Sequence, residues 1–294
     1  METLRELFAT YQSLFGFIGL NGLLALSVWV TLSCGQLSLA SAGFMAIGAY
    51  TSALLTVHTQ LPFALVLLAG AVAAGLVAVP LGLPVLRLRG VFLAIATIGF
   101  GEVVRLFFVN LEFTNGALGL TAVPQRTRLW LVYAVLAAAL IGLWRLQGTR
   151  AGLALEAIRE DETAARTMGI DTTLYKLSMF VTGALLAGLA GGLEAHLTFM
   201  VAPSGYGFSR VVDMLVQAVV GGTTICFGPV LGAAFLTALP ELVREASARA
   251  GLAPGPFRLL LNGLVLLAVI LWLPNGLASL PARLRAQARA RRTP

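Results

Sequence analysis

Residues 62–86 read PFALVLLAGAVAAGLVAVPLGLPVL, an apolar run without a charged side chain. A helix rises about 1.5 Å per residue, so a run of this length can cross the roughly 30 Å hydrocarbon core of a bilayer. Similar runs recur near 14–33, 42–57, 90–110, 128–146, 175–200, 210–222, 229–244 and 256–274. Because a segment inside a bilayer must satisfy its own backbone hydrogen bonds, these runs predict membrane-spanning helices.

The composition of the whole chain agrees with this interpretation. Of 294 residues, 58% are hydrophobic and only 11% are charged, which leaves too little polar surface for a water-soluble protein. We therefore predict an all-α integral membrane protein, a polytopic bundle of about 8–10 transmembrane helices. Residues 1–294 are expected to form a single transmembrane domain.

The apolar run at 210–222 is too short to cross a membrane alone. It is separated from the next run by Gly221, Gly222 and the pair Gly228-Pro229. The sequence therefore predicts a broken or re-entrant segment near 210–230, either two half-helices or a hairpin. Irregular backbone at this depth is tolerated only where it is buried in protein or lines a cavity.

Two other polar features interrupt the apolar runs. Gln36, Ser38 and Ser41 follow the first run, where they either face a solute path or accompany small residues that let helices pack closely. Glu102 and Arg105 lie three residues apart in an otherwise apolar run. Since residues at this spacing share a helix face, we expect a structural ion pair.

The basic residues are distributed as topology signals rather than as a nucleic-acid surface. Nineteen of the twenty are arginines, and they cluster between apolar runs and in the tail 281–294. If the tail is cytoplasmic, bases on that side outnumber those on the other. The sequence predicts a multi-pass protein of the cell (inner) membrane, with the C-terminus and the loop 147–174 in the cytoplasm. Membrane lipids, and no nucleic acid, are the expected contacts of these bases.

The loop 147–174 combines charges with an apolar stripe. Leu155, Ile158, Ala165 and Met168 recur at helical spacing between charged residues, and Gly169 is placed to end the last turn in a left-handed conformation. This pattern predicts two short amphipathic helices along the membrane surface. A solvated connector is the alternative, but a connector seldom keeps an apolar stripe unless something packs against it.

We find no catalytic or metal-binding pattern. The phosphate-binding motif GxxxxGK[ST] needs a lysine after glycine, and the only lysine, Lys176, follows a tyrosine. His58 and His196 have no second ligand at metal-site spacing, and Cys34 and Cys226 are expected to be structural thiols. We therefore expect no cofactor, no metal and no catalytic residue: a pore-forming subunit and not an enzyme.

Several stretches resemble the LivM-type permease subunits of ATP-binding-cassette (ABC) importers for branched-chain amino acids. They are 35–39 (GQLSL), 87–97 (RLRGVFLAIAT), 100–106 (FGEVVRL), 157–162 (AIREDE), 186–193 (LAGLAGGL) and 228–233 (GPVLGA). The resemblance implies a second homologous permease subunit, two ABC ATPase subunits and an extracytoplasmic solute-binding protein as partners. The substrate is then a branched-chain amino acid or a similar small polar solute.

The resemblance also implies roles for two sets of residues. The ATPase-coupling set is Leu155, Glu156, Ile158, Arg159, Glu160, Asp161, Glu162, Ala165, Arg166, Met168 and Gly169. The translocation-pathway set is Gln36, Ser38, Ser41, Thr97, Gly221 and Gly222. One alternative is a self-contained, ion-coupled secondary transporter or channel, which needs a coupling carboxylate or histidine deep in a helix bundle. Glu102 and Glu194 are its candidates. A membrane scaffold, the third possibility, predicts neither the polar interruption at Gln36 nor the charged loop.

Overall fold

A computed structural model describes residues 11–121, 123–249, 263, 267, 276 and 277. Its helices are α2 (Gln12–Leu32), α3 (Ser41–His58), α4 (Phe63–Val85), α5 (Val91–Asn110), α6 (Leu129–Gln147), α7 (Arg150–Glu160), α8 (Glu162–Thr167), α9 (Thr172–Thr198), α10 (Phe208–Gly221) and α11 (Gly228–Arg249). The helices match eight of the expected apolar runs to within a few residues, apart from a longer C-terminal end of α11. The ninth run, 256–274, lies outside the described residues. The prediction of an all-α polytopic membrane protein is confirmed.

Five helices of the described chain are long and apolar enough to cross a membrane, namely α2, α4, α5, α6 and α9. α9 lies at the centre and packs against α2, α3 and α4. Glycines allow this close approach: a Cβ atom on Gly48 of α3 would lie only 2.2 Å from the carbonyl oxygen of Gly188 on α9. Small residues at helix crossings are typical of membrane bundles, where close packing replaces the hydrophobic effect.

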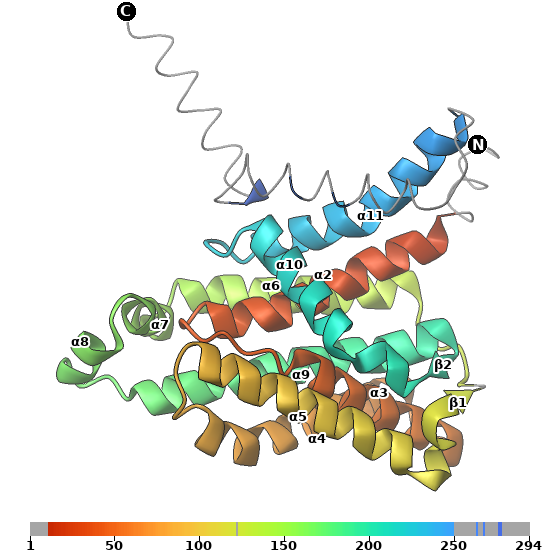
Figure 1. The fold of residues 1–294 in the computed structure, drawn as a ribbon, viewed down its shortest axis with the longest axis horizontal. Helices are drawn as coiled ribbons and strands as arrows, with labels where there is room; N and C mark the ends of the chain where they lie inside the picture. The colour runs from red at the N-terminus through yellow and green to blue at the C-terminus, as the bar shows by residue number, and fades with distance from the viewer. Residues whose placement is uncertain (1–10, 122, 250–262, 264–266, 268–275, 278–294) are drawn as a thin grey trace, which may run out of the picture.

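The bundle has two different ends (Figure 1). At one end, α7 and α8 project beyond the long helices. At the other, the short strands β1 (Leu120–Thr121) and β2 (Met200–Val201) pair antiparallel, with Leu120 opposite Val201. Three 3₁₀ turns lie in the same two connections, η1 (Glu112–Thr114), η2 (Gly116–Leu118) and η3 (Pro203–Tyr206). We call these the helical end and the strand end.

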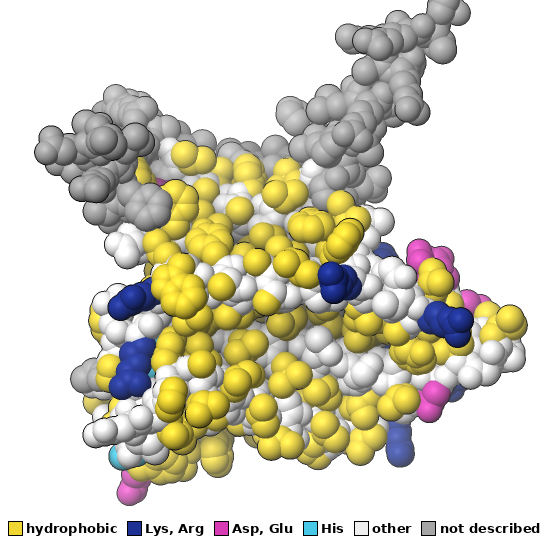
Figure 2. All heavy atoms as spheres, turned by 180° about the vertical axis from the view of Figure 1, so that it is seen from behind, with side chains coloured by type: hydrophobic (Ala, Val, Ile, Leu, Met, Phe, Trp, Pro, Cys, Tyr) yellow, Lys and Arg dark blue, Asp and Glu magenta, His cyan; other side chains and the backbone are white. Residues whose placement is uncertain are grey.

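The surface between the two ends is largely apolar (Figure 2). Hydrophobic side chains cover the middle of the face shown, and most of its charged side chains gather toward the ends. Leu76, Phe92 and Trp130 are among the large apolar side chains that are exposed on the outer helices. Such a belt is the surface expected of a protein that is surrounded by lipid.

α10 and α11 form the broken segment that the sequence predicts. α10 ends at Gly221, and Gly222 adopts φ +103°, a backbone conformation that residues other than glycine rarely adopt. A Cβ atom on Gly221 would lie 2.0 Å from the carbonyl oxygen of Gly228, so the two helices meet backbone to backbone. With 14 residues, α10 rises only about 21 Å and cannot cross the bilayer alone.

Candidate functional site

Three side chains start the helices of the loop at the helical end. The Thr149 hydroxyl accepts a hydrogen bond from the Gly152 N–H at 3.3 Å, and Asp161 Oδ1 accepts from Thr163 and Ala164 at 2.7 and 3.1 Å. Asp171 caps α9 in the same way. Such caps satisfy N–H groups that have no partner within the helix. Asp161, expected in the coupling set, therefore starts α8.

Gly169 ends α8 as the sequence predicts. It adopts φ +81°, and its N–H donates to the Arg166 carbonyl oxygen at 3.0 Å. The N–H of Ile170 donates to the Ala165 carbonyl oxygen at 3.2 Å. This pair of hydrogen bonds is the Schellman arrangement, which turns the chain back toward the start of α9.

The apolar stripe is only partly as expected. Leu155, Ile158 and Ala165 are buried, with Ile158 only 3% exposed. Met168 is 83% exposed, so its expected place in the buried stripe is wrong. The reason is local: α8 ends at Thr167, and the helical spacing that would turn Met168 inward stops there. Glu156, Arg159 and Glu160 are exposed, as charges that meet a partner must be.

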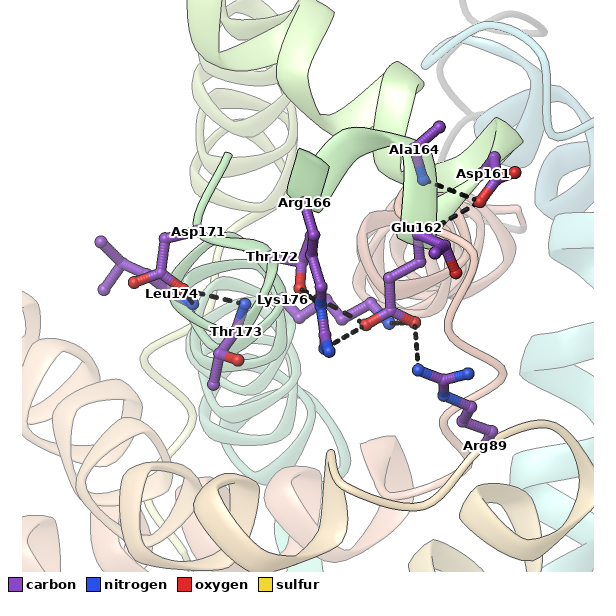
Figure 3. Close-up of polar contacts among 11 residues, drawn as sticks. Arg89, Asp161, Glu162, Ala164, Arg166, Asp171, Thr172, Thr173, Leu174 and Lys176 are labelled. Atoms are coloured by element: carbon purple, nitrogen blue, oxygen red, sulfur yellow. Dashed lines mark hydrogen bonds and ion pairs between the residues drawn. The ribbon is translucent and has the colours of Figure 1, made fainter. Parts of the chain in front are cut away.

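Glu162 is the centre of a charge cluster that joins three parts of the chain (Figure 3). Its carboxylate lies 2.8 Å from Lys176 Nζ on α9, 2.7 Å from Arg166 Nη2 on α8 and 3.7 Å from Arg89 Nη2 between α4 and α5. Arg166 also donates to the Thr172 hydroxyl at 2.8 Å. The Glu162 side chain is only 18% exposed, so this carboxylate acts within the permease. Its predicted place among the residues that contact the ATPase does not fit this position.

The environment of Glu162 favours its charged form. Burial raises the pKa of this carboxyl, but the hydrogen bond and charge of Lys176, followed by the charges of Arg166 and Arg89, outweigh it, and the net pKa is lowered. Arg87 lies beside the cluster and lines the same cavity of about 400 Å³. The cluster therefore fixes α8 to α9 and to the α4–α5 connection at neutral pH.

α7 lies against the first interruption of the membrane helices, at Gly35, and faces the second across a small cavity. A cavity of about 120 Å³ separates it from α2, α6, α9 and the α10–α11 turn; its walls include Trp29, Leu155, Arg159, Thr223 and Thr224. A Cβ atom on Gly35 would lie 3.5 Å from the Arg159 Cα. The Trp29 indole N–H donates to the Thr223 carbonyl oxygen at 2.9 Å, which ties α2 to the same turn. Movement of α7 would therefore change the surroundings of both interruptions.

Part of the expected pathway set is brought together at the start of α3. Gln36 is 2% exposed, and neither polar atom of its side chain has a hydrogen-bond partner among the described residues. The Thr97 hydroxyl accepts a hydrogen bond from the Leu39 N–H at 2.9 Å. It donates within its own helix, where the carbonyl oxygens of Leu93 and Ala94 both lie at 2.9 Å. Ser38 and Ser41 are also buried here. Gly221 and Gly222 lie in the α10–α11 turn, where Gly222 packs against Gly276.

The ionisable side chains within the membrane helices are mostly paired. Arg105 Nε donates to Glu102 Oε2 at 2.7 Å, the expected ion pair. Arg210 Nη2 donates to both carboxylate oxygens of Glu194, at 3.1 and 2.9 Å. This second pair was not predicted from the sequence, since it depends on where the fold places α10 relative to α9. A charged pair between two apolar helices lowers the cost of burying either charge.

His196 is a packing residue. Its Nε2 lies 2.9 Å from the Thr56 hydroxyl, its Nδ1 lies 2.8 Å from the Gly192 carbonyl oxygen, and its ring meets Phe63 edge-on. Among the described residues, no three histidine, cysteine or acidic side chains are grouped as metal ligands.

Asp213 is a further intramembrane group that the sequence analysis did not single out. It lies on α10 one turn after Arg210, and its side chain is exposed. The signal was present in the sequence, since an acidic residue inside an apolar helix is rarely without a function.

Comparisons with known proteins point in one direction. Residues 11–270 match the family described as "Branched-chain amino acid transport system / permease component". The high-affinity branched-chain amino acid transport system permease protein LivM of Salmonella typhimurium is 36% identical, over 92% of this chain and 68% of its own. LivM of Escherichia coli is 34% identical over the same shares.

A more distant relative and one solved structure are also similar. The probable branched-chain amino acid transport permease protein LivH of Methanocaldococcus jannaschii is 34% identical, over 32% of this chain and 29% of its own. The structure of PsaBC from Streptococcus pneumoniae in complex with Fab has a TM-score of 0.51 at 16% identity, covering 91% of this chain and 95% of that one. At this identity the structural likeness concerns the fold alone.

Proposed function

The chain belongs to the family of permease components of branched-chain amino acid transport systems, and we propose that it carries a branched-chain amino acid across the cell membrane as one subunit of an ABC importer. Membership of this family favours the importer over a self-contained, ion-coupled transporter. The two carboxylates that the sequence offered for ion coupling, Glu102 and Glu194, are both engaged by arginines.

The position of α7, in contact with Gly35 and across a small cavity from the α10–α11 turn, is the observation that carries the mechanism. In the proposed cycle, ATPase subunits bind α7 and α8 on the cytoplasmic side, and their closure moves this loop. The Glu162 cluster transmits the movement to α9 and to the α4–α5 connection. α7 transmits it to Gly35 by direct contact, and it changes the cavity that α7 shares with the α10–α11 turn. Access to the pathway then alternates between the two ends. ATP hydrolysis takes place in the partner subunits.

The other proposed partners have separate surfaces. A solute-binding protein would deliver substrate at the strand end, opposite α7 and α8. The second permease would pack against α5, which exposes Phe92, Ile95 and Val103 on one side. Gly99 lies on the same side, and a Cβ atom there would meet nothing within 4 Å. A glycine on an open apolar face lets another helix approach closely.

Exposure identifies the side chains of the loop that an ATPase can reach. Ile158 is buried against the permease itself, whereas Leu153 on α7 and Met168 after α8 are 63% and 83% exposed. Large apolar side chains that protrude from a polar element beyond the membrane are typical of a protein–protein interface. We therefore propose that Leu153 and Met168, with Glu156, Arg159 and Glu160 around them, form the ATPase contact.

Substitution of Met168 tests the coupling surface. Met168→Asp should weaken ATPase binding about tenfold or more, which corresponds to about 1.4 kcal/mol, because a charge replaces an apolar contact. Thermal stability of the isolated permease should not change. The measurement is ATPase recovery with the purified permease, alongside amino-acid uptake in vesicles.

Leu118→Asp is the matched control for this experiment. Leu118 is 80% exposed, but it lies at the strand end, so ATPase recovery should stay normal. Ile158→Asp serves as a second reference, since it should lower the stability of the permease itself. If Met168→Asp and Leu153→Asp both retain full ATPase binding and uptake, the loop is not the docking site.

A further inference from the structure

A cavity of about 530 Å³ lies between α2, α10 and α11, in the half of the bundle nearer the strand end. Its size falls within the usual range of small-molecule sites, about 300–1,000 Å³. Polar groups enter it from three helices: Asn21 from α2, Arg210 and Asp213 from α10, and Thr237 from α11. Asn21 Nδ2 donates to the Thr237 hydroxyl at 2.9 Å and so fixes α2 against α11 at the cavity wall.

Arg210 and Asp213 offer opposite charges on one side of the cavity. They are three residues apart on α10 and therefore share a helix face, with Cβ atoms about 5–6 Å apart. Both hydrogen bonds of Arg210 to Glu194 come from Nη2, so the N–H groups of Nη1 remain available. Asp213 is exposed and makes no hydrogen bond or ion pair with any residue that the structure describes.

Apart from Gln217, the remaining side chains of the wall are apolar. Val212, Val216, Leu236 and Leu239 line the same cavity. A carboxylate at membrane depth that faces an open cavity, next to a partly occupied guanidinium and an aliphatic wall, is typical of a solute pathway. A ligand that fits this cavity therefore carries a positive group, a negative group close to it, and an aliphatic side chain.

We propose that this cavity is a transport site for zwitterionic aliphatic α-amino acids, an inference that rests on the function proposed above. The ammonium group of the substrate binds the Asp213 carboxylate, and its carboxylate binds the Arg210 guanidinium. The aliphatic side chain packs against Val212, Val216 and Leu236. Urea and simple amides lack the charged pair and would leave Asp213 without a partner.

α10 connects the cavity with the helical end of the bundle. Gln217 is buried at the cavity wall one turn after Asp213, and its Oε1 has no partner among the described residues. One turn further, α10 ends at Gly221, at the turn that lines a small cavity together with α7. A substrate held at Asp213 is therefore connected along a single helix to the element that the ATPases would move.

Protection of a cysteine placed in the cavity tests this site. We would introduce Leu236→Cys in a transporter with Cys34→Ala and Cys226→Ala, and follow its reaction with a maleimide in membrane vesicles. Leucine at about ten times its dissociation constant should slow labelling about tenfold. The analogue 4-methylpentanoate, which lacks the ammonium group, and 3-methylbutylamine, which lacks the carboxylate, should protect far less.

Charge-removing variants and controls complete the test. Asp213→Asn should abolish protection by leucine, whereas Glu112→Gln, an exposed carboxylate at the same end but outside the cavity, should leave it intact. Full protection in Asp213→Asn, or equal protection by 4-methylpentanoate, would overturn the proposal. A third outcome would also overturn it: the Asp213→Asn variant no longer binds the second permease, and leucine has no effect on labelling. Asp213 would then be an interface residue.

The cavity and the proposed function can fail separately. Uptake of labelled leucine by the wild-type transporter, supplied with its binding protein and ATP, without protection of the introduced cysteine would overturn the cavity alone. Absence of that uptake would contradict the branched-chain substrate of the proposed function.

Discussion

At the scale of single residues, the difference between Glu162 and its neighbours carries the most information. Glu160 and Glu162 look equivalent in the sequence AIREDE, yet one side chain is exposed and the other is enclosed by Lys176, Arg166 and Arg89. The α8 helix begins at Glu162, which turns this side chain toward the bundle. One of the two carboxylates is therefore free for a partner, and the other holds the loop in place.

Removal of the Glu162 charge should loosen the loop. At pH 7, Glu162→Gln should lower the free energy of unfolding by about 2 kcal/mol, because Lys176 loses a charged hydrogen-bond partner. Since the pKa of Glu162 is lowered in the folded protein, its contribution is complete above the unfolded value of about 4.3 and is lost as pH falls through the folded pKa. The variant and the wild type should therefore converge in thermal stability at low pH.

Thermal unfolding in detergent between pH 7 and pH 3 is the measurement. Glu160→Gln is the control and should match the wild type throughout, because the Glu160 side chain is exposed. A stability difference for Glu162→Gln that persists unchanged at pH 3 would show that the effect is not electrostatic.

At the scale of elements, the α10–α11 hairpin is held by close approaches of backbone to backbone. A Cβ atom on Gly232 would lie 2.1 Å from the Gln217 carbonyl oxygen, and one on Gly276 would lie 2.4 Å from the Gly222 Cα. Neighbouring backbones therefore fill the space in which side chains would lie. We expect an element with such close packing to move as a unit. It could then transmit movement between α7 and the cavity around Asp213.

Replacement of Gly222 tests whether the hairpin moves during transport. Gly222→Leu should reduce uptake strongly while the subunit stays assembled, because a side chain at φ +103° costs about 1–3 kcal/mol and displaces the turn between α10 and α11. Gly142→Leu on α6 is the control, since a Cβ atom at Gly142 meets nothing within 4 Å. Both variants are compared by uptake at matched expression. Normal uptake by Gly222→Leu would show that the break is only a connection.

At the scale of the whole molecule, the two ends face different compartments in the proposed mechanism. Single cysteines in place of Thr149 and Thr293, in a background without Cys34 and Cys226, should resist an impermeant thiol reagent in intact cells. Thr293 lies outside the described residues. A cysteine in place of Leu118, at the strand end, should react. Labelling at Thr149 or Thr293 before lysis would refute the proposed orientation.

Much of the architecture was predictable from local sequence properties. Helix ends follow from runs of apolar residues, and caps such as Asp161 and the left-handed Gly169 are set by residues within one turn. The pairing of Glu102 with Arg105 is also local, because both lie on one helix face. Met168 was placed wrongly because its exposure depends on where α8 stops, which the apolar spacing alone does not specify.

The sequence by itself determined that this protein is a helical membrane bundle with a charged loop and one broken segment, since each of these depends on neighbouring residues. Only the tertiary structure decided which groups meet: Arg89 with Glu162, Glu194 with Arg210, and α7 with Gly35. In a bilayer, side chains that face lipid and side chains that face another helix are equally apolar, so hydropathy does not indicate which helices pack together. That choice is made by close packing at glycines such as Gly48 and Gly188.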